Sequence, residues 1–335
     1  MSAASLSPVT RTPELALYEY TAEAARFPHG PRIFIVSTPE TRRICNDPFL
    51  TGVRYTSSLS DACARTIREL ESRRFVSLAE DTTSVLNILR GGLNFGLREA
   101  LARALSWNDH CSLFLSAQRA RKSDNPHDWV ITESDYQKVD LHHRNDILLG
   151  DVVATGTSLA WALERLGDVA TNHHTEISSL LFFTIGSPRS HEILAATSNE
   201  YARRFKGFRG SVVVYFEGIF PAATPETAMQ IKLDGTDLLR TGGILAPEFI
   251  ESQYEAPAYP IERCTIYDAG SRAFHLKEYL EDVHDYWSQT LALAEQGLTF
   301  KALLRERFPE LEAGRFGSVD LVALARTQRD RAIRH

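Results

Sequence analysis

Residues 146–159 constrain the fold of this chain more than any other stretch. The apolar residues 147–149 and 152–153 are typical of a strand that is buried on both faces. Small and hydroxyl-bearing residues follow, and from Ser158 onward apolar residues recur at helical spacing: Leu159, Ala162, Leu163 and Leu166. The stretch therefore predicts a strand, a tight turn and the start of a helix.

The turn between this strand and helix has the composition of an anion site. Ala154, Thr155, Gly156, Thr157 and Ser158 would bring backbone N–H groups and hydroxyls to the positive end of the helix. An acid precedes them, since Asp151 stands at the predicted strand end and could hold sugar hydroxyls. The combination suggests a ribose 5-phosphate site, and an ordinary strand-to-helix turn rich in small residues is the alternative.

A second turn of the same kind precedes it in the chain. Residues 85–89 are apolar and predict a strand, Arg90, Gly91 and Gly92 form the turn, and residues 93–107 have a helical pattern. Arg90 supplies positive charge and the glycines allow close approach of a ligand to the backbone. A structural turn with an incidental arginine is the alternative. Parallel strands place their carboxyl ends at one edge of a sheet, so we expect the two turns to converge.

Between the two turns lies a long polar and basic segment, residues 116–128. Such a loop could close over a polyanion, and Arg119, Arg121 and Lys122 are its candidate cationic groups. A charged loop that is merely solvated is the alternative reading.

Composition limits the possible functions. The chain has 335 residues, 43% of them hydrophobic and 24% charged, which predicts a globular protein with one enlarged domain or two. A net charge of −6 argues against nucleic-acid binding. The four cysteines are scattered, and there is neither a leader pattern nor an apolar run of about 18 residues. We therefore expect a cytoplasmic protein that binds neither nucleic acid nor membrane.

Residues 150–158 resemble the phosphoribosyl-pyrophosphate (PRPP) signature of type I phosphoribosyltransferases, and the Ala-Thr-Gly core is most similar to the uracil phosphoribosyltransferase branch. The turn around Arg90 resembles the pyrophosphate-binding turn of that family, and Arg119 and Arg121 fall where the family has a flexible flap. Residues 268–274 resemble the loop with which uracil phosphoribosyltransferases recognise uracil, which makes Asp268 and Gly270 candidates for acceptor binding. One departure is Gly150, where the family normally has a second acid.

The resemblance implies an α/β fold of phosphoribosyltransferase type: a parallel sheet flanked by helices, with an enlarged hood and a helical C-terminal tail. The expected division is an N-terminal arm at 1–30, a core at 31–216, a hood that binds the acceptor at 217–274 and a C-terminal extension at 275–335. The family is also expected to form homo-oligomers.

The implied reaction displaces pyrophosphate from PRPP by a ring nitrogen of a nucleobase-like acceptor. Arg90 and Asp151 would be the catalytic residues, and Mg²⁺ the cofactor, held through the ribose by Asp151. Two alternatives remain open. The chain could bind PRPP or a nucleotide as a non-catalytic regulator, which the missing acid at Gly150 favours, or it could use an unusual acceptor, which a long insertion at 221–259 favours.

Several weaker expectations complete the prediction. Residues 1–13 are expected to be frayed, 14–27 to form a helix, and 262–267 a strand that leads into a turn at 268–274. Glu217 is expected to be a solvated acid at a strand end. Residues 275–295 have a strongly amphipathic helical pattern, and the tail that contains them carries no catalytic motif.

Overall fold

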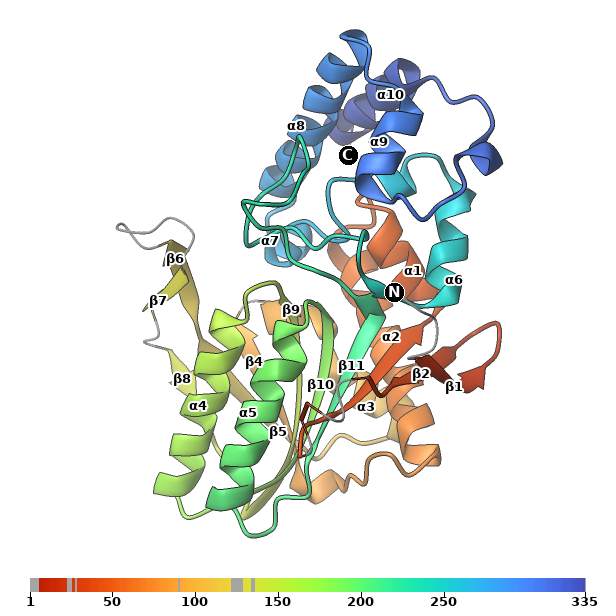
Figure 1. Cartoon of the computed structure of the whole chain (residues 1–335). Coiled ribbons are helices and arrows are strands. Elements are labelled where there is room, and N and C mark those ends of the chain that lie inside the picture. Colours follow the sequence, from red (N-terminus) through yellow and green to blue (C-terminus); the bar gives the residue numbers. More distant parts are fainter. Residues whose placement is uncertain are drawn as a thin grey trace.

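The computed structural model describes residues 6–22, 26–27, 29–89, 91–121, 129–133 and 136–334. A mixed sheet forms the centre of the molecule (Figure 1), with strand order β1-β2-β3-β11-β10-β9-β4-β5-β8. Its middle strands all run parallel: β3 (Arg32–Ser37), β11 (Ser211–Ile219), β10 (Glu176–Gly186), β9 (Arg144–Val153), β4 (Thr83–Leu89) and β5 (Cys111–Ser116). This confirms the predicted α/β class with a largely parallel sheet.

Short antiparallel strands complete the sheet at its edges: β1 (Leu6–Arg11) and β2 (Ala16–Tyr20) beside β3, and β8 (Gln137–Lys138) beside β5. One more short strand, β12 (Ile244–Leu245), pairs antiparallel with the last residues of β11. A separate hairpin consists of β6 (Gln118–Arg121) and β7 (Trp129–Glu133). In the sheet centre, Leu149 of β9 pairs with Leu86 on one side and with Phe182 on the other. All three side chains are at most 1% exposed, which explains the continuous apolar runs in the sequence.

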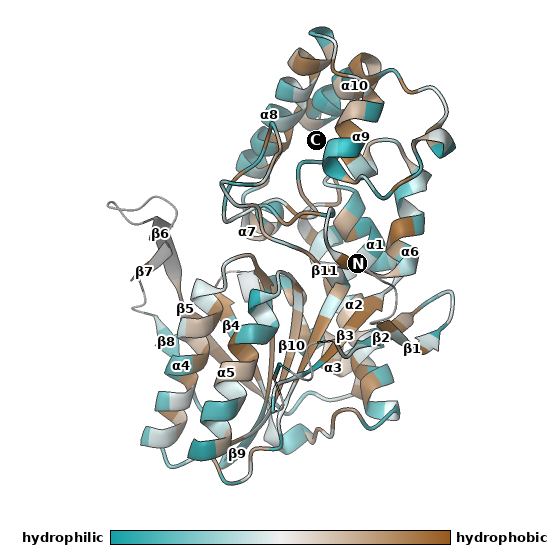
Figure 2. Cartoon of the chain, viewed as in Figure 1, coloured by the Kyte–Doolittle hydropathy of each residue, from teal (hydrophilic) through white to brown (hydrophobic). Residues whose placement is uncertain are grey.

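Helices cover the sheet. In Figure 1, α4 (Thr157–Asn172) and α5 (Arg189–Arg204) lie side by side across one face, and α2 (Gly52–Ser72) and α3 (Leu97–Leu105) lie behind the other. Figure 2 shows the strands mostly brown, while hydrophilic teal marks the outer sides of α4 and α5. This separation of apolar and polar residues places the core between sheet and helices.

The chain after β11 forms an upper lobe, residues 220–334, above the carboxyl ends of the strands (Figure 1). Long irregular segments connect its helices: α6 (Pro247–Ser252), α7 (Ala269–Phe274), α8 (Leu276–Glu295), α9 (Phe300–Arg307) and α10 (Leu321–Arg334). The amphipathic helix expected at 275–295 is confirmed as α8. None of the helices in the described residues combines the length and the apolar character that crossing a bilayer requires.

Four local predictions were wrong. Residues 16–20, expected within a helix, form β2, and residues 6–11, expected to be frayed, form β1. Short apolar runs fit either periodicity, and here pairing with β3 decides for the strand. Residues 262–267 form no strand, and the turn expected at 268–274 is the helix α7.

Buried arginines attach the upper lobe to the rest of the molecule. Arg272 of α7 is 1% exposed, and its guanidinium donates to three main-chain carbonyls at and just beyond the end of α1 (Pro39–Asn46). The acceptors and distances are Leu50 O at 2.8 Å, Ile44 O at 3.0 Å and Asp47 O at 2.7 Å. Arg240, 3% exposed, donates to Cys45 O at 3.2 Å. These bonds supply donors to carbonyls that have no partner within α1, and the bonds of Arg272 fix α7 against α1.

Candidate functional site

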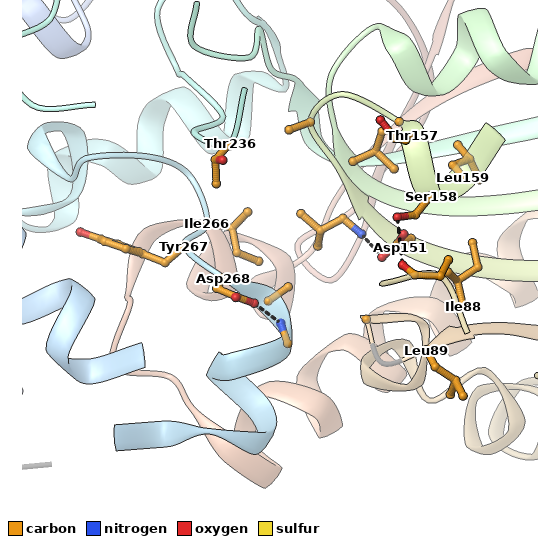
Figure 3. Close-up of a pocket in the computed structure, with 18 residues that line it drawn as sticks. Ile88, Leu89, Asp151, Thr157, Ser158, Leu159, Thr236, Ile266, Tyr267 and Asp268 are labelled. Atoms are coloured by element: carbon orange, nitrogen blue, oxygen red, sulfur yellow. Dashed lines mark hydrogen bonds between the residues drawn. The ribbon is translucent and has the colours of Figure 1, made fainter. Parts of the chain in front are cut away.

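A cavity of about 430 Å³ lies where the upper lobe faces the strand ends (Figure 3). One wall comes from the ends of β4, β5 and β9 and the start of α4, and the other comes from the upper lobe. The core wall consists of Ile88, Leu89, Gly91, Ala117, Asp151, Val152, Val153, Ala154, Gly156, Thr157, Ser158 and Leu159. The lobe wall consists of Thr236, Ile266, Tyr267, Asp268, Ala269 and Gly270.

The turn from β9 to α4 has the geometry of an anion-binding site, which we call the anion seat. Gly156 is the N-cap of α4 with φ +79°, a left-handed conformation that favours glycine, and a Cβ atom there would also press on Ile193 Cδ1 at 2.3 Å. Thr157 and Ser158 open the helix beside the cavity, where N–H groups lack partners within the helix. Thr155 is not among the lining residues, and its Oγ1 lies 3.3 Å from Thr157 Oγ1.

Asp151 and Gly91 bring the two predicted turns together. Both line the cavity, and a Cβ atom at residue 91 would lie 2.6 Å from Asp151 Oδ1. Glycine at 91 is therefore what leaves room for the carboxylate. The same oxygen accepts a bond from Val152 N at 2.9 Å. The second glycine of that turn, Gly92, packs against Gly150 O instead of lining the cavity.

Two candidate groups remain predictions. Arg90 and the basic residue Lys122 lie outside the described residues. Arg119 and Arg121 belong to strand β6, whose pairing with β7 extends away from the sheet in Figure 1. The side chains of both arginines lie outside what the structure describes, so these two cations also remain predictions.

Gly150 has a structural explanation. A Cβ atom at this position would stand 2.4 Å from Phe95 Cγ and 2.7 Å from Phe95 Cδ1, and Phe95 is fully buried. The ring occupies the space that any side chain at 150 would need. The departure from the family pattern therefore reflects packing of Phe95, which lies in a short 3-10 helix, Gly91–Phe95.

The lobe wall is built around the start of α7. Asp268 is the N-cap of this helix, and its Oδ1 accepts bonds from Gly270 N at 2.8 Å and Ser271 N at 3.1 Å. Within the described chain, no hydrogen bond to its Oδ2 is present. Figure 3 shows Ile266 directed toward the cavity and the hydroxyl of Tyr267 directed away from it. That hydroxyl donates to Glu262 Oε2 at 2.7 Å.

A second cavity, of about 320 Å³, adjoins the first. Leu89, Asp268 and Gly270 line both cavities, and the second is completed by Ser116, Ser271, Phe274 and His275. Asp268 and Gly270, which the sequence suggested as acceptor-binding residues, thus lie on the boundary between the two cavities.

The charges on the main cavity are both acidic. Asp151 projects from the core wall and Asp268 from the lobe wall, and the described lining residues include no lysine, arginine or histidine. Magnesium in nucleotide sites is usually held by one or two carboxylates together with substrate phosphates. Within the described residues no cluster of three or more His, Cys, Asp or Glu side chains suited to a metal is found. Asp151, beside the start of α4, therefore fits a metal that is shared with a phosphorylated ligand.

Glu217 is not the solvated acid that the sequence suggested. It is fully buried, has φ +66°, and accepts bonds from Thr38 N at 3.3 Å and from Thr41 Oγ1 at the N-terminus of α1. Burial raises its pKa to about 8, although the hydrogen bond from Thr41 acts in the opposite direction. Its left-handed backbone at the end of β11 is a local strain that the sequence pattern does not reveal.

The sequence also missed the remaining lobe-wall residues. Thr236 lies in an irregular loop, and Ile266 lies in a segment that was expected to be a strand. Neither belongs to a motif with a spacing that could identify it, because their place at the cavity depends on how the upper lobe packs. Proximity to the Asp268 turn was the one signal that could have drawn attention to Ile266.

No protein-family model and no curated protein sequence matches this chain. Among solved structures it is similar to a hypoxanthine-guanine phosphoribosyltransferase from Bacillus anthracis at 16% identity, covering 47% of this chain and 80% of that one with a TM-score of 0.27. The hypoxanthine-guanine enzyme of L. donovani matches at 18% identity, over 51% and 86% of the two chains, with a TM-score of 0.27. A hypoxanthine phosphoribosyltransferase from Trypanosoma cruzi matches at 14% identity, over 60% and 95%, with a TM-score of 0.26.

Proposed function

We propose that this chain binds PRPP in the main cavity and transfers its phosphoribosyl group to a nucleobase-like acceptor, with release of pyrophosphate. The observation that carries the proposal is the meeting of Asp151, Gly91 and the N-terminus of α4 in one cavity. An acid beside an anion seat suits a phosphorylated ribose, because the seat binds the 5-phosphate while the carboxylate accepts bonds from ribose hydroxyls.

In the proposed reaction, a ring nitrogen of the acceptor forms a bond to C1 of the ribose. The bond from C1 to the pyrophosphate oxygen breaks, pyrophosphate leaves with the electron pair, and the acceptor loses its N–H proton to solvent. Thr157 and Ser158 would anchor the phosphate, and Asp151 would orient the ribose, so that the chain contributes mainly positioning. Mg²⁺, held by Asp151 together with the phosphates, would supply charge neutralisation.

The charge on the lobe wall favours an uncharged acceptor. Residues 266–270 and Thr236 are all described, and the charge on this wall is the carboxylate of Asp268. A carboxylate-bearing acceptor would face repulsion there, whereas an N–H donor could reach Asp268 Oδ2. We therefore propose a neutral heterocycle, and the motif resemblance favours one of uracil type.

Asp151→Asn tests the proposal, with Asp168→Asn on the surface of α4 as the control. Calorimetry with PRPP and Mg²⁺ should show affinity falling about tenfold or more in the first variant, because the amide is a weaker acceptor. The control should bind as the unmodified chain does. Equal affinity in both variants would remove Asp151 from the site.

A second candidate is a regulator that binds PRPP or a nucleotide without turnover, which the absence of an acid at Gly150 favours. A pyrophosphate-release assay separates the two. Release with uracil or hypoxanthine but not with a carboxylated pyrimidine supports the neutral-acceptor enzyme, while binding without release from any base supports the regulator.

A further inference from the structure

The upper lobe contains a buried group of charged residues for which neither the motifs nor the proposed reaction gives a role. Arg263 and Arg307 are 6% and 2% exposed, and Asp237 is fully buried. Charged side chains are rarely buried without partners, and here they meet each other and Asp282 of α8. We call Asp237, Arg263, Asp282 and Arg307 the clamp.

Arg263 is the centre of the clamp. Its guanidinium donates to both carboxylate oxygens of Asp282, at 2.6 and 2.9 Å, and its Nε lies 3.2 Å from Asp237 Oδ2. It also stacks over the ring of Tyr267, 4.5 Å from the ring centroid. One side chain thus contacts α8, the loop that contains Asp237 and the segment that leads into α7.

Arg307 fixes the same region from α9. It donates to Arg263 O at 3.1 Å and to Ile231 O at 2.6 Å. Arg307 therefore joins the segment around Arg263 to the loop that contains Ile231 and Asp237. Asp237 in turn accepts a bond from Leu233 N at 2.9 Å, which closes the loop on itself. The clamp therefore holds two irregular segments that share no strand or helix.

Both segments end at the main cavity. Thr236 directly precedes Asp237, and Ile266 follows Arg263 by three residues, and both line the lobe wall. A main-chain bond from Thr265 N to Leu238 O, 2.8 Å long, joins the two segments directly, and side chains from elsewhere add further links to both. Here those side chains come from α8 and α9, in the C-terminal extension.

We infer that the clamp positions the lobe wall of the cavity. Through it, the C-terminal helices determine the geometry of acceptor binding. The inference rests on the proposed function for its kinetic readout. Asp282 and Arg263 touch no substrate in this account, and they act through the placement of Thr236 and Ile266. The PRPP side of the cavity, built on β9 and α4, does not depend on them.

Asp282→Asn is the direct test, because this side chain is partly exposed and the amide keeps its shape while removing one of the two ionic partners of Arg263. We expect the KM for the acceptor to rise about tenfold, since small displacements of positioning groups have effects of this order. The KM for PRPP should change less than twofold. Asp282→Glu, which restores the carboxylate, should recover much of the acceptor KM.

Asp285→Asn is the matched control, on the exposed side of the same helix, and it should behave as the unmodified chain. A purely structural role would lower the melting temperature and kcat without separating the two KM values. That result, or an unchanged acceptor KM in Asp282→Asn, would overturn the inference.

Amide hydrogen exchange keeps the inference testable if no acceptor turns over. Asp282→Asn should then speed exchange in peptides covering 229–240 and 264–270 but not in peptides covering 146–166. Absence of turnover in the unmodified chain would count against the proposed function alone, whereas unchanged exchange in the variant would count against the clamp.

Discussion

The parallel sheet and the upper lobe provide hydrogen-bond partners for their buried main-chain groups in different ways. Both must bury main-chain N–H and C=O groups, each of which needs a partner. In the sheet, neighbouring strands satisfy one another, and side chains such as Leu149 and Phe182 only need to be apolar. In the upper lobe and at its contact with α1, some carbonyls have no partner within a strand or helix, and buried arginines donate to them.

The two walls of the cavity therefore differ in the contacts that determine their shape. The core wall follows from strand pairing and the start of α4. The lobe wall depends also on a few buried charged side chains, chiefly Arg240, Arg263, Arg272 and Arg307, whose partners include residues far away in the sequence. Single substitutions should therefore disturb the upper lobe more than the sheet.

The largest expected effect is that of Arg272→Met. This change removes the guanidinium that donates to three carbonyls, and it leaves those of Ile44 and Leu50 without that donor, while Asp47 O keeps its bond from Leu50 N. We expect the free energy of unfolding to fall by about 3 to 5 kcal/mol. Ile147→Val in β9 is the matched change in the sheet and should cost about 1 kcal/mol. Urea denaturation measures both, and equal losses would break the contrast between sheet and lobe.

A smaller but still clear loss is expected for Gly150→Ala, which tests how tightly the sheet side is packed. The added methyl would stand against the ring of Phe95, so this strand must shift or the ring must turn. Overpacking of this kind costs about 1 to 3 kcal/mol. Thermal unfolding of the variant checks the value. A stability equal to that of the unmodified chain would mean that Phe95 can move aside, and that an acid at 150 is not excluded by packing.

The next effect depends on pH and sharpens the contrast at the junction of sheet and lobe. The pKa of Glu217 is raised to about 8 in the folded chain by burial. The folded state therefore keeps a proton that the unfolded state releases near its ordinary pKa, and the free energy of unfolding falls as pH rises between these values. Between pH 6 and pH 8 this group should remove about 2 kcal/mol of stability.

Glu217→Gln removes the titration while keeping the shape and most hydrogen bonds. Denaturation of the two proteins at pH 6 and pH 8 should show that the variant loses less unfolding free energy between these pH values than the unmodified chain does. The pKa of Glu262 is also raised by burial, to about 7, but this residue is present in both proteins and its contribution cancels. Identical pH profiles would show that Glu217 does not bind its proton more tightly when folded.

The sequence by itself determined the parts of this protein whose signals are local. The apolar run before Asp151, the turn around Gly156 and the periodicity of α4 and α8 each follow from residues that are neighbours in the chain, because strand burial, glycine turns and helix faces have their own short-range patterns. The convergence of the two turns could be predicted too, because the ends of parallel strands meet at one edge of a sheet.

Only the tertiary structure decided the remaining features. Residues 16–20 became a strand because β3 offered an edge, and Gly150 must be a glycine because Phe95 packs against it. The lobe wall around Ile266 depends on Arg263 and its distant partners. Contacts between residues far apart in the chain leave no periodic trace in the sequence, so their consequences appear only once the chain has folded.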